Sequence, residues 1–521
     1  MKSETVEYRL QEFLRGHFGR EFTDNKKVIS ISCLQFGDTG KGKFVDLFAN
    51  WADMIVRPTG GNNAGHTIYY QGKELVLHMV PSGIVHPEKT NIIGSDTVID
   101  PSELFEELSA LNRRGIEVNN LFISLRANLI LPTHIVLDRL GEMNAGKARV
   151  GTTGKGIGPT YIDKVARRGL TMNDLLNPKT FRRKLEKLLD YHRRLIKEMG
   201  GYESAWQILE KMNKSYTAVV GGISSGELFS AANIADVYLQ LGQLLRGFIT
   251  DTDKMVRDAV GYKNILLEGA QGFMLSIDYG TYPYVTCSDC SPAGMAKGAG
   301  LKESDIDASF GIIKGFYETR VGKGSFPTEI GGKDSEQWCN ELGSRDKEQE
   351  MFSAATVNDA NPYMQGIALR RRAGEYGATT GRPRRVGWLD VPMLRYALEL
   401  SGVKHIIMTK LDVLTGIRTI VLCHSYEYDG PDYYYGDHHF TKGMIVDTAV
   451  PDPEVLDNCK PVYKEFDGWE TDISGFTEAE ELPVRLTRIA RYLENSIGHR
   501  ARIAIISVGP EPDNTIFMPK Y

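Results

Sequence analysis

The stretch "VISISCLQFGDTGKGKF", residues 28–44, joins an apolar run to a glycine-rich loop. The run predicts a buried strand, and the loop has the phosphate-binding spacing G-x-x-x-x-G-K from Gly37 to Lys43. Phe44 stands where a Ser or Thr would bind magnesium, so a metal would need another ligand. Asp38 lies inside the loop, where it would repel a phosphate unless a cation or a proton lay between them. Asp38 is therefore a candidate metal ligand or general base.

Similar apolar runs recur along the chain, and helical segments separate them. They cover residues 52–57, 90–95, 121–131, 264–269, 308–316, 404–412, 418–428 and 501–509. Several lack polar alternation, which is typical of parallel strands covered on both faces. We predict an α/β fold with a large, mostly parallel central sheet, flanking helices and glycine-rich loops at one end of the sheet. We expect residues 27–521 to form one domain, residues 1–26 to be a loosely attached extension, and residues 331–374 to be a polar insertion.

Composition argues against several classes of partner: nucleic acid, membranes and a structural zinc ion. The chain has 62 basic and 67 acidic residues, a formal charge of -5, which argues against a bulk electrostatic grip on nucleic acid or acidic membrane. No run approaches the roughly 20 apolar residues that span a bilayer. Six scattered cysteines fit reduced thiols, and Cys287 and Cys290 form a lone C-x-x-C without the second ligand pair of a zinc site. We expect a cytoplasmic protein with no nucleic-acid or membrane partner.

Three further glycine-rich loops carry polar side chains suited to anionic ligands. The first, residues 57–67, contains Asn63 and His66, and a histidine can protonate a group that gains charge. The loops at residues 151–169 and 377–385 combine paired threonines with arginines, which suit carboxylate or phosphate. Together the loops predict a pocket for several anionic groups.

The segment "MTKLDV", residues 408–413, predicts the choice of nucleotide. Asp412 can accept hydrogen bonds from the N1–H and the exocyclic amine of guanine, whereas adenine offers no matching pair of donors. This favours GTP over ATP. A helix N-cap aspartate is the alternative interpretation of the same residue.

These segments resemble the adenylosuccinate synthetase family, GTP-dependent enzymes that join aspartate to inosine monophosphate (IMP). The matching stretches follow the family's order from Gln35 to Pro510: "QFGDTGKGK", "GGNNAGHT", "VLHMVPSGI", "GTTGKGIGPTYIDKVARRG", "LLEGAQGFMLSIDYGTYPYVT", "TRVGKGSFPTE", "GATTGRPRRVGWLD", "TKLDVLTG" and "SVGP". The series covers nearly the whole chain apart from the N-terminal tail and the insertions.

The resemblance implies a mechanism as well as a fold. Asp38 and the main-chain carbonyl of Gly65 would bind Mg²⁺, which explains why Phe44 is no defect. Asp38 would take the purine N1 proton, so that the 6-oxygen attacks the γ-phosphorus of GTP, and the aspartate amine would then displace phosphate. His66 would be the general acid, with Lys41 beside the moving phosphoryl group. The catalytic set implied is Asp38, His66, Lys41 and Gln271.

The same resemblance implies three sets of binding residues and a homodimer. GTP would meet Gly37, Asp38, Thr39, Gly40, Lys41, Gly42, Lys43, Gly65, His66, Thr67, Arg384, Lys410, Leu411, Asp412, Ser507, Val508, Gly509 and Pro510. IMP would meet Asp38, Lys41, Asn63, Ala64, Gly65, His66, Thr153, Arg167, Gln271, Leu275, Thr286 and Arg382, with Arg167 contributed across the dimer interface. L-Aspartate would meet Thr379, Thr380, Gly381, Arg382 and Arg384.

Departures from the family pattern leave two alternatives open. Thr39 replaces the usual Glu, Lys155 replaces an Arg, Pro383 interrupts a run of arginines, and "TCSDC" replaces Thr-Ser-Ser-Asn. Some phage relatives convert 2′-deoxyguanylate (dGMP) to a 2-amino product, but they commonly carry Ser at the position of Asp38, which favours IMP here. A non-catalytic GTP-binding regulator is the alternative of another class; the presence of both Asp38 and His66 argues against it.

Overall fold

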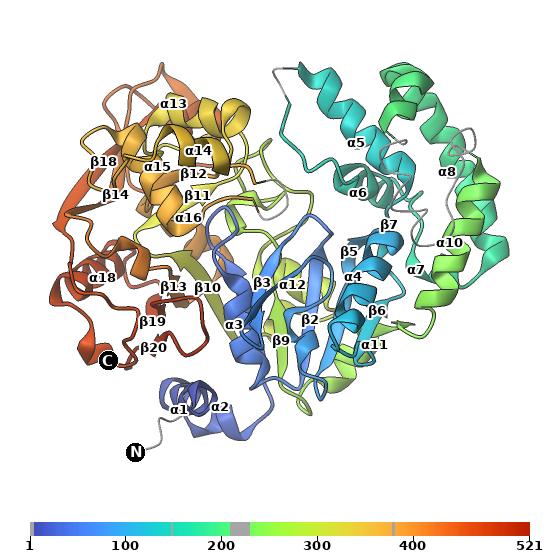
Figure 1. The fold of residues 1–521 in the computed structure, drawn as a ribbon, viewed down its shortest axis with the longest axis horizontal. Helices are drawn as coiled ribbons and strands as arrows, with labels where there is room; N and C mark the ends of the chain where they lie inside the picture. The colour runs from blue at the N-terminus through green and yellow to red at the C-terminus, as the bar shows by residue number, and fades with distance from the viewer. Residues whose placement is uncertain (1–4, 147–148, 209–229, 378–380, 521) are drawn as a thin grey trace.

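The computed structural model describes residues 5–146, 149–208, 230–377 and 381–520. An eleven-stranded sheet forms its centre, in the order β20-β19-β13-β10-β1-β9-β2-β5-β6-β8, with β7 paired to β5 (Figure 1). Every pairing in this sheet is parallel except that of β19 with β20, which confirms the predicted fold class. Its strands are β1 Val28–Cys33, β2 Met54–Gly60, β5 Thr90–Ile99, β6 Leu121–Ser124, β7 Asn128–Leu129, β8 Ile249–Thr250, β9 Ile265–Glu268, β10 Ala308–Lys314, β13 His405–Thr409, β19 Arg502–Ser507 and β20 Thr515–Phe517.

Two groups of helices flank the sheet in Figure 1. Helices α13 to α16 lie at the upper left, and α5, α6, α8 and α10 lie at the upper right and right. The helices are α1 Val6–Phe18, α2 Arg20–Asp24, α3 Lys41–Ala49, α4 Pro101–Arg113, α5 Pro132–Ala145, α6 Ile157–Val165, α7 Met172–Leu175, α8 Pro178–Met199, α10 Ala231–Leu245, α11 Thr252–Ala259, α12 Pro292–Gly298, α13 Gly332–Gln337, α14 Arg345–Met351, α15 Pro362–Ala373, α16 Val391–Ser401, α17 Pro453–Leu456 and α18 Val484–Ser496. Among the described residues, none of the helices is long and apolar enough to cross a membrane.

Smaller antiparallel sheets carry the remaining strands. They are β3 His66–Tyr70 with β4 Lys73–Leu77, β11 Tyr317–Arg320 with β12 Arg385–Trp388, β15 Tyr433–Tyr435 with β16 His438–Phe440, and β14 Thr419–Tyr428 between β17 Ile445–Val446 and β18 Cys459–Asp467. The run at residues 418–428 is therefore a strand, as predicted, but it lies outside the central sheet. Its residues alternate in burial along much of its length, as antiparallel strands with one solvated face do.

The packing of α3 on the sheet places the phosphate loop. All six residues of β1 are buried, and Phe44 and Phe48 of α3 pack in the same apolar cluster. Phe44, which replaces the magnesium-binding Ser or Thr, is therefore a core residue. A Cβ at Gly42 would lie 2.3 Å from the carbonyl oxygen of Thr67, so only glycine lets the helix approach β3 this closely.

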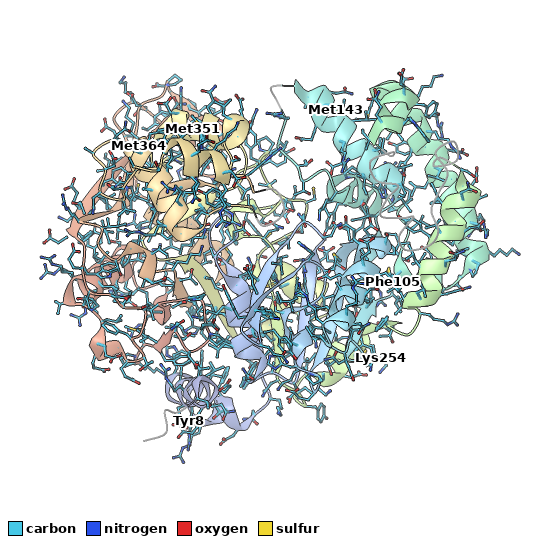
Figure 2. The ribbon with its side chains drawn as sticks, viewed as in Figure 1. Tyr8, Phe105, Met143, Lys254, Met351 and Met364 are labelled. Carbon is cyan, nitrogen blue, oxygen red and sulfur yellow. The ribbon has the colours of Figure 1, made fainter. Side chains whose placement is uncertain are left out.

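The N-terminal extension is packed more firmly than expected. It forms α1 and α2, and one face of α1 buries Val6, Leu10 and Leu14 in the cluster that lies beneath β1 and β10. Arg9 adds a hydrogen bond of 2.7 Å to the carbonyl oxygen of Thr515 in β20. Tyr8 lies on the exposed face of α1 (Figure 2). Four residues of spacing between Leu10 and Leu14 give the helix an apolar face, and that face attaches it to the sheet.

The polar insertion at residues 331–374 is helical and has its own buried network. Glu348 is fully buried and accepts hydrogen bonds from Nη1 of Arg370 at 2.9 Å, Nε1 of Trp338 at 2.7 Å and the hydroxyl of Tyr376 at 2.5 Å. These contacts join α14 to α15 and to the helical turn Trp338–Leu342 that follows α13. These helices have no apolar stripe from which they could be predicted, because paired polar side chains occupy part of their interior.

Candidate active site

The phosphate loop runs from the end of β1 to the start of α3. Gly37 and Gly40 have positive φ angles of 87° and 80°, and α3 begins at Lys41. The loop following β9 packs directly on it, because a Cβ at Gly272 would lie 2.3 Å from the carbonyl oxygen of Gln35. Nζ of Lys41 donates a hydrogen bond of 2.6 Å to the carbonyl oxygen of Gln271. Two of the residues predicted to be catalytic are thus in direct contact.

Asp38 faces an arginine from a distant loop. Its carboxylate lies 2.9 Å from Nη2 of Arg384, and 36% of its side-chain surface is exposed. Burial of the remainder would raise the pKa of Asp38, but Arg384, Lys314 and Lys41 hold it below its ordinary value. The carboxylate is therefore ionised at neutral pH and able to accept a proton or a cation. The structure brings one residue of the predicted aspartate site next to the predicted base.

His66 begins β3 and is buried against a second carboxylate. Its Nδ1 is hydrogen-bonded to Oε1 of Glu268. The hydroxyl of Ser82 also donates to Oε1, at 2.6 Å, and the backbone N–H of Ser82 donates to Oε2, at 2.9 Å. Burial lowers the pKa of His66, and Glu268 partly offsets that effect. With Nδ1 engaged, Nε2 is the ring atom left for proton transfer. Sequence reasoning missed Glu268; a charge at the end of the otherwise apolar run "NILLE" was the available signal.

Lys43 holds a neighbouring loop in place. Its Nζ donates to Oγ of Ser507 at 2.7 Å and to the carbonyl oxygens of Gly509 and Asn514, both at 2.9 Å. Burial lowers the pKa of Lys43 to about 7, although Asp412 raises it. The phosphate loop and the loop at residues 507–510, both predicted to contact GTP, are therefore tied together through this side chain. The predicted contact of Lys43 itself with GTP stays a prediction.

The predicted guanine segment is tied to the same place. Oγ1 of Thr409, at the end of β13, donates to the carbonyl oxygen of Thr39 at 2.9 Å. Lys410 follows with a positive φ of 57°, and Asp412 begins a short 3-10 turn, Asp412–Leu414. Burial raises the pKa of Asp412, while Lys410 and Lys43 counteract it. Thus the predicted base-recognition residues lie beside the phosphate loop.

An open cleft of about 660 Å³ joins the predicted IMP and aspartate residues. Thr153, Arg382 and Arg384 line it together, and Met143 at the end of α5 also lines it (Figure 2). Asn340, from the insertion, lies on its wall, a contribution that sequence reasoning missed. Thr379 and Thr380, predicted to bind aspartate, lie outside the described residues.

Other predicted IMP residues show features that suit a ligand. The N–H of Thr286 donates to the carbonyl oxygen of Leu275 at 2.8 Å, so these two lie together. In the described part of the chain, Oδ1 of Asn63 is buried without a hydrogen-bond partner. Lys155 donates to the carbonyl oxygen of Asn62 at 2.9 Å, which links the second and third glycine-rich loops. A buried acceptor without a donor is costly unless a ligand supplies one.

Arg167 is exposed just after α6, in a left-handed conformation with φ 62°. The inner face of α6 is fixed by Asp163, which accepts hydrogen bonds from Nε2 of His134 and of His192, both at 2.8 Å. These three residues could be taken for a metal site. However, the N–H of Leu131 donates to Nδ1 of His134, so Nε2 carries the proton that Asp163 accepts and has no lone pair for a metal. The group is a hydrogen-bonded support for α6.

An α/β fold with a phosphate-loop pattern at the end of a central strand is typical of nucleotide-binding enzymes. A family model described as adenylosuccinate synthetase matches residues 30–516. The chain is 39% identical over 487 residues to adenylosuccinate synthetase of Halothermothrix orenii, covering 93% of this chain and 96% of that protein. The chain therefore belongs to the adenylosuccinate synthetase family, which confirms the resemblance, and it is a GTP-binding ligase of purine biosynthesis.

Solved structures agree with the family and the fold. The fully ligated adenylosuccinate synthetase of Plasmodium falciparum has a TM-score of 0.75 and 30% identity, covering 94% of this chain and all of that chain. Succinoaminodeoxyadenylate synthetase of cyanophage S-2L, bound to dGMP and dATP, has a TM-score of 0.50 and 18% identity, covering 95% of this chain and 96% of that chain. The second likeness is one of fold alone.

Proposed function

We propose that the protein ligates L-aspartate to IMP with GTP, giving adenylosuccinate, GDP and phosphate through 6-phosphoryl-IMP. The observation that carries this proposal is that the chain has both an ionised Asp38 in the phosphate loop and a buried His66 that is hydrogen-bonded to Glu268. The reaction needs both groups, because N1 of the purine must lose a proton while charge develops on the transferred phosphoryl group.

Each step has a residue suited to it. Asp38 takes the proton from N1, and the electrons of that bond make the 6-oxygen a nucleophile for the γ-phosphorus of GTP, from which GDP departs. Lys41 and Nε2 of His66 donate hydrogen bonds to the phosphoryl oxygens as negative charge redistributes. The amine of aspartate then attacks carbon 6 and releases one proton, the bond to the phosphorylated oxygen breaks, and phosphate leaves with that electron pair and takes up the proton.

The donor set at the phosphate loop fits Mg²⁺. The partly exposed carboxylate of Asp38 and the main-chain carbonyl of Gly65, an exposed residue, are hard oxygen donors of the kind this ion prefers. When bound, Mg²⁺ would neutralise charge on the phosphates of GTP. The ion pair of Asp38 with Arg384 would have to loosen for this carboxylate to become a ligand.

Other assignments rest on the gathered loops. We assign guanine binding to Lys410 and Asp412, and aspartate binding to the segment at residues 379–384. We assign IMP binding to Asn63, Thr153 and the other members of the IMP set given under Sequence analysis. We treat residues 27–521 as one domain, because its central sheet takes strands from Val28 to Phe517. Because its nucleotide substrates are cytoplasmic, we assign the enzyme to the cytoplasm.

We also propose a homodimer in which Arg167 reaches the other subunit's site. Ile162 and Val165, on the outer face of α6, have 61% and 79% of their surface exposed beside Arg167. Exposed apolar side chains grouped on a rigid helix suit a contact with another copy of the chain. The support from Asp163 would hold this helix in place for such a contact.

A single assay tests the reaction. Purified protein receives aspartate, Mg²⁺ and GTP with either IMP or dGMP, and phosphate release and purine absorbance are followed. Turnover of IMP supports the proposal. Turnover of dGMP alone would indicate the phage-type reaction, and GTP binding without turnover of either substrate would indicate a regulator.

A further inference from the structure

Glu375, two residues after the end of α15, is the centre of an ionic cluster in the middle of the site. Its carboxylate is fully buried. Oε1 lies 2.7 Å from Nζ of Lys410 and accepts a hydrogen bond of 3.0 Å from the hydroxyl of Tyr317. Oε2 lies 2.8 Å from Nζ of Lys314 and 2.7 Å from Nη1 of Arg384. One carboxylate thus contacts three cations and a hydroxyl.

Two of these cations come from segments assigned to different substrates, and Arg384 is also in the predicted GTP set. Lys410 comes from the predicted guanine segment after β13, and Arg384 comes from the predicted aspartate segment before β12. Arg384 also bridges to Asp38 at 2.9 Å. A continuous chain of ion pairs therefore runs from the predicted base-recognition segment, through Glu375, to the predicted general base.

The cluster holds Lys410 and Arg384 tightly. Nζ of Lys410 has a second partner, the carbonyl oxygen of Ala373 at 2.9 Å, and the residue has a left-handed backbone. The N–H of Arg384 donates to the carbonyl oxygen of Glu375 at 3.0 Å, so backbone and side chain are fixed to the same residue. Loss of the Glu375 charge would remove the one ion-pair partner that the two cations share.

One donor of Arg384 is left for an anionic ligand. The three cations hold the pKa of Glu375 well below its ordinary value against the opposing effect of burial. Nε of Arg384 is buried without a partner among the described residues, and such a donor can bind a carboxylate.

We propose that Glu375 is a positioning residue that fixes Lys410 and Arg384 relative to each other and thereby couples the binding of GTP to the binding of aspartate. This inference rests on the proposed function, which assigns those two cations to the two substrates. Glu375 touches neither substrate. It acts through the two side chains that do, and linkage requires each substrate to strengthen the other's binding by the same factor.

The test compares Glu375→Gln with wild type in steady-state kinetics. Glutamine keeps the size but removes the charge that holds the cations. We expect the KM values for GTP and aspartate both to rise at least about tenfold, while the KM for IMP changes less than about twofold. We also expect the apparent affinity for aspartate to stop depending on the GTP concentration. Glu375→Asp, which restores the charge at a shorter reach, should recover part of both KM values.

A matched control separates positioning from stability. Asp174→Asn removes another buried carboxylate, but one that pairs with Lys184 and not with a predicted substrate contact. It should lower the melting temperature without a selective change in the KM values for GTP and aspartate. If Glu375→Gln does not fold, the same kinetics are read from Glu375→Asp, where smaller rises of both KM values are expected.

Two failures can be told apart. A wild type that releases no phosphate with IMP and aspartate would overturn the proposed function. An active wild type whose Glu375 variants raise all three KM values equally, or only lose melting temperature, would overturn the positioning role alone.

Discussion

Nδ1 of His66 is hydrogen-bonded to Oε1 of Glu268, a fully buried carboxylate at the end of β9. Burial lowers the pKa of His66, whereas the charge of Glu268 and this hydrogen bond raise it. The pair therefore does two things: it orients the ring so that Nε2 is free, and it preserves some protonated imidazole in a buried place.

The first prediction is that Glu268→Gln moves the alkaline limb of the kcat profile to lower pH. The variant lacks the charge that raises the pKa of His66, so that pKa falls further. A general acid is active below its pKa, so activity is lost at a lower pH as the pH rises. We expect kcat at pH 8 to fall at least about tenfold, measured across pH 6 to 9. Ser82→Ala, which keeps the charge, should shift the limb less, and coincident profiles for Glu268→Gln and wild type would contradict the role.

The second prediction concerns the choice of nucleotide. Asp412→Asn removes the charge that strengthens hydrogen bonds to the N1–H and amine of guanine, at a cost of about 1–3 kcal/mol in GTP binding. Calorimetric titration should show weaker GTP binding, while the KM for IMP changes little. A wild type that uses ATP as well as GTP would show that Asp412 does not select the base.

Local patterns in the sequence predicted the parallel sheet and the glycine-rich loops, because burial and turn geometry depend on neighbouring residues. Asp38 and His66 were recognisable for the same reason: each interrupts a glycine-rich segment with a reactive side chain. Glu268 and Glu375 were not. His66 and Glu268 are 202 residues apart in the chain. The cations around Glu375 come from three different segments, β10, the turn after β13 and the segment before β12, and only the fold brings these together.

Long-range packing also explains the other differences. Lys43 fits a phosphate-loop pattern, yet its ammonium group binds the loop at residues 507–510, which only the fold brings near. The insertion looked like a loop because the partners of Glu348 are a Trp, a Tyr and an Arg, and such a network has no periodic apolar signature. The firm packing of α1 was missed for a different reason: its apolar face packs on strands that are distant in the chain.

The third prediction tests the proposed dimer contact. Val165→Asp places a charge on the exposed apolar face of α6, so we expect light scattering to report a monomer with a nearly unchanged melting temperature. Tyr262→Asp is the matched control, because Tyr262 is 81% exposed on a distant part of the chain. It should leave the mass unchanged. A dimer that persists in Val165→Asp would place the interface elsewhere.

The fourth prediction tests whether two subunits share a site. Arg167→Leu and Asp38→Ala should each be inactive, because one lacks the contributed arginine and the other lacks the base. Mixed dimers contain one site with neither defect, so mixing should restore part of the activity. The readout is phosphate release after subunit exchange. Mass spectrometry of differently tagged chains measures how far the exchange has gone. Complete exchange without restored activity would count against a shared site.

The fifth prediction is that Asp38→Asn abolishes most turnover and leaves the fold intact. Asn keeps the size and one oxygen but cannot take the N1 proton, so kcat with IMP should fall at least about a hundredfold, the lower end for loss of a general base. Asp38 has a positive φ of 51°, which Asn tolerates, and its ion pair with Arg384 is partly exposed and so contributes little stability. The melting temperature should therefore stay within a few degrees of wild type. Turnover within tenfold of wild type would refute Asp38 as the base, whereas a large fall in melting temperature would show that its contact with Arg384 supports the fold.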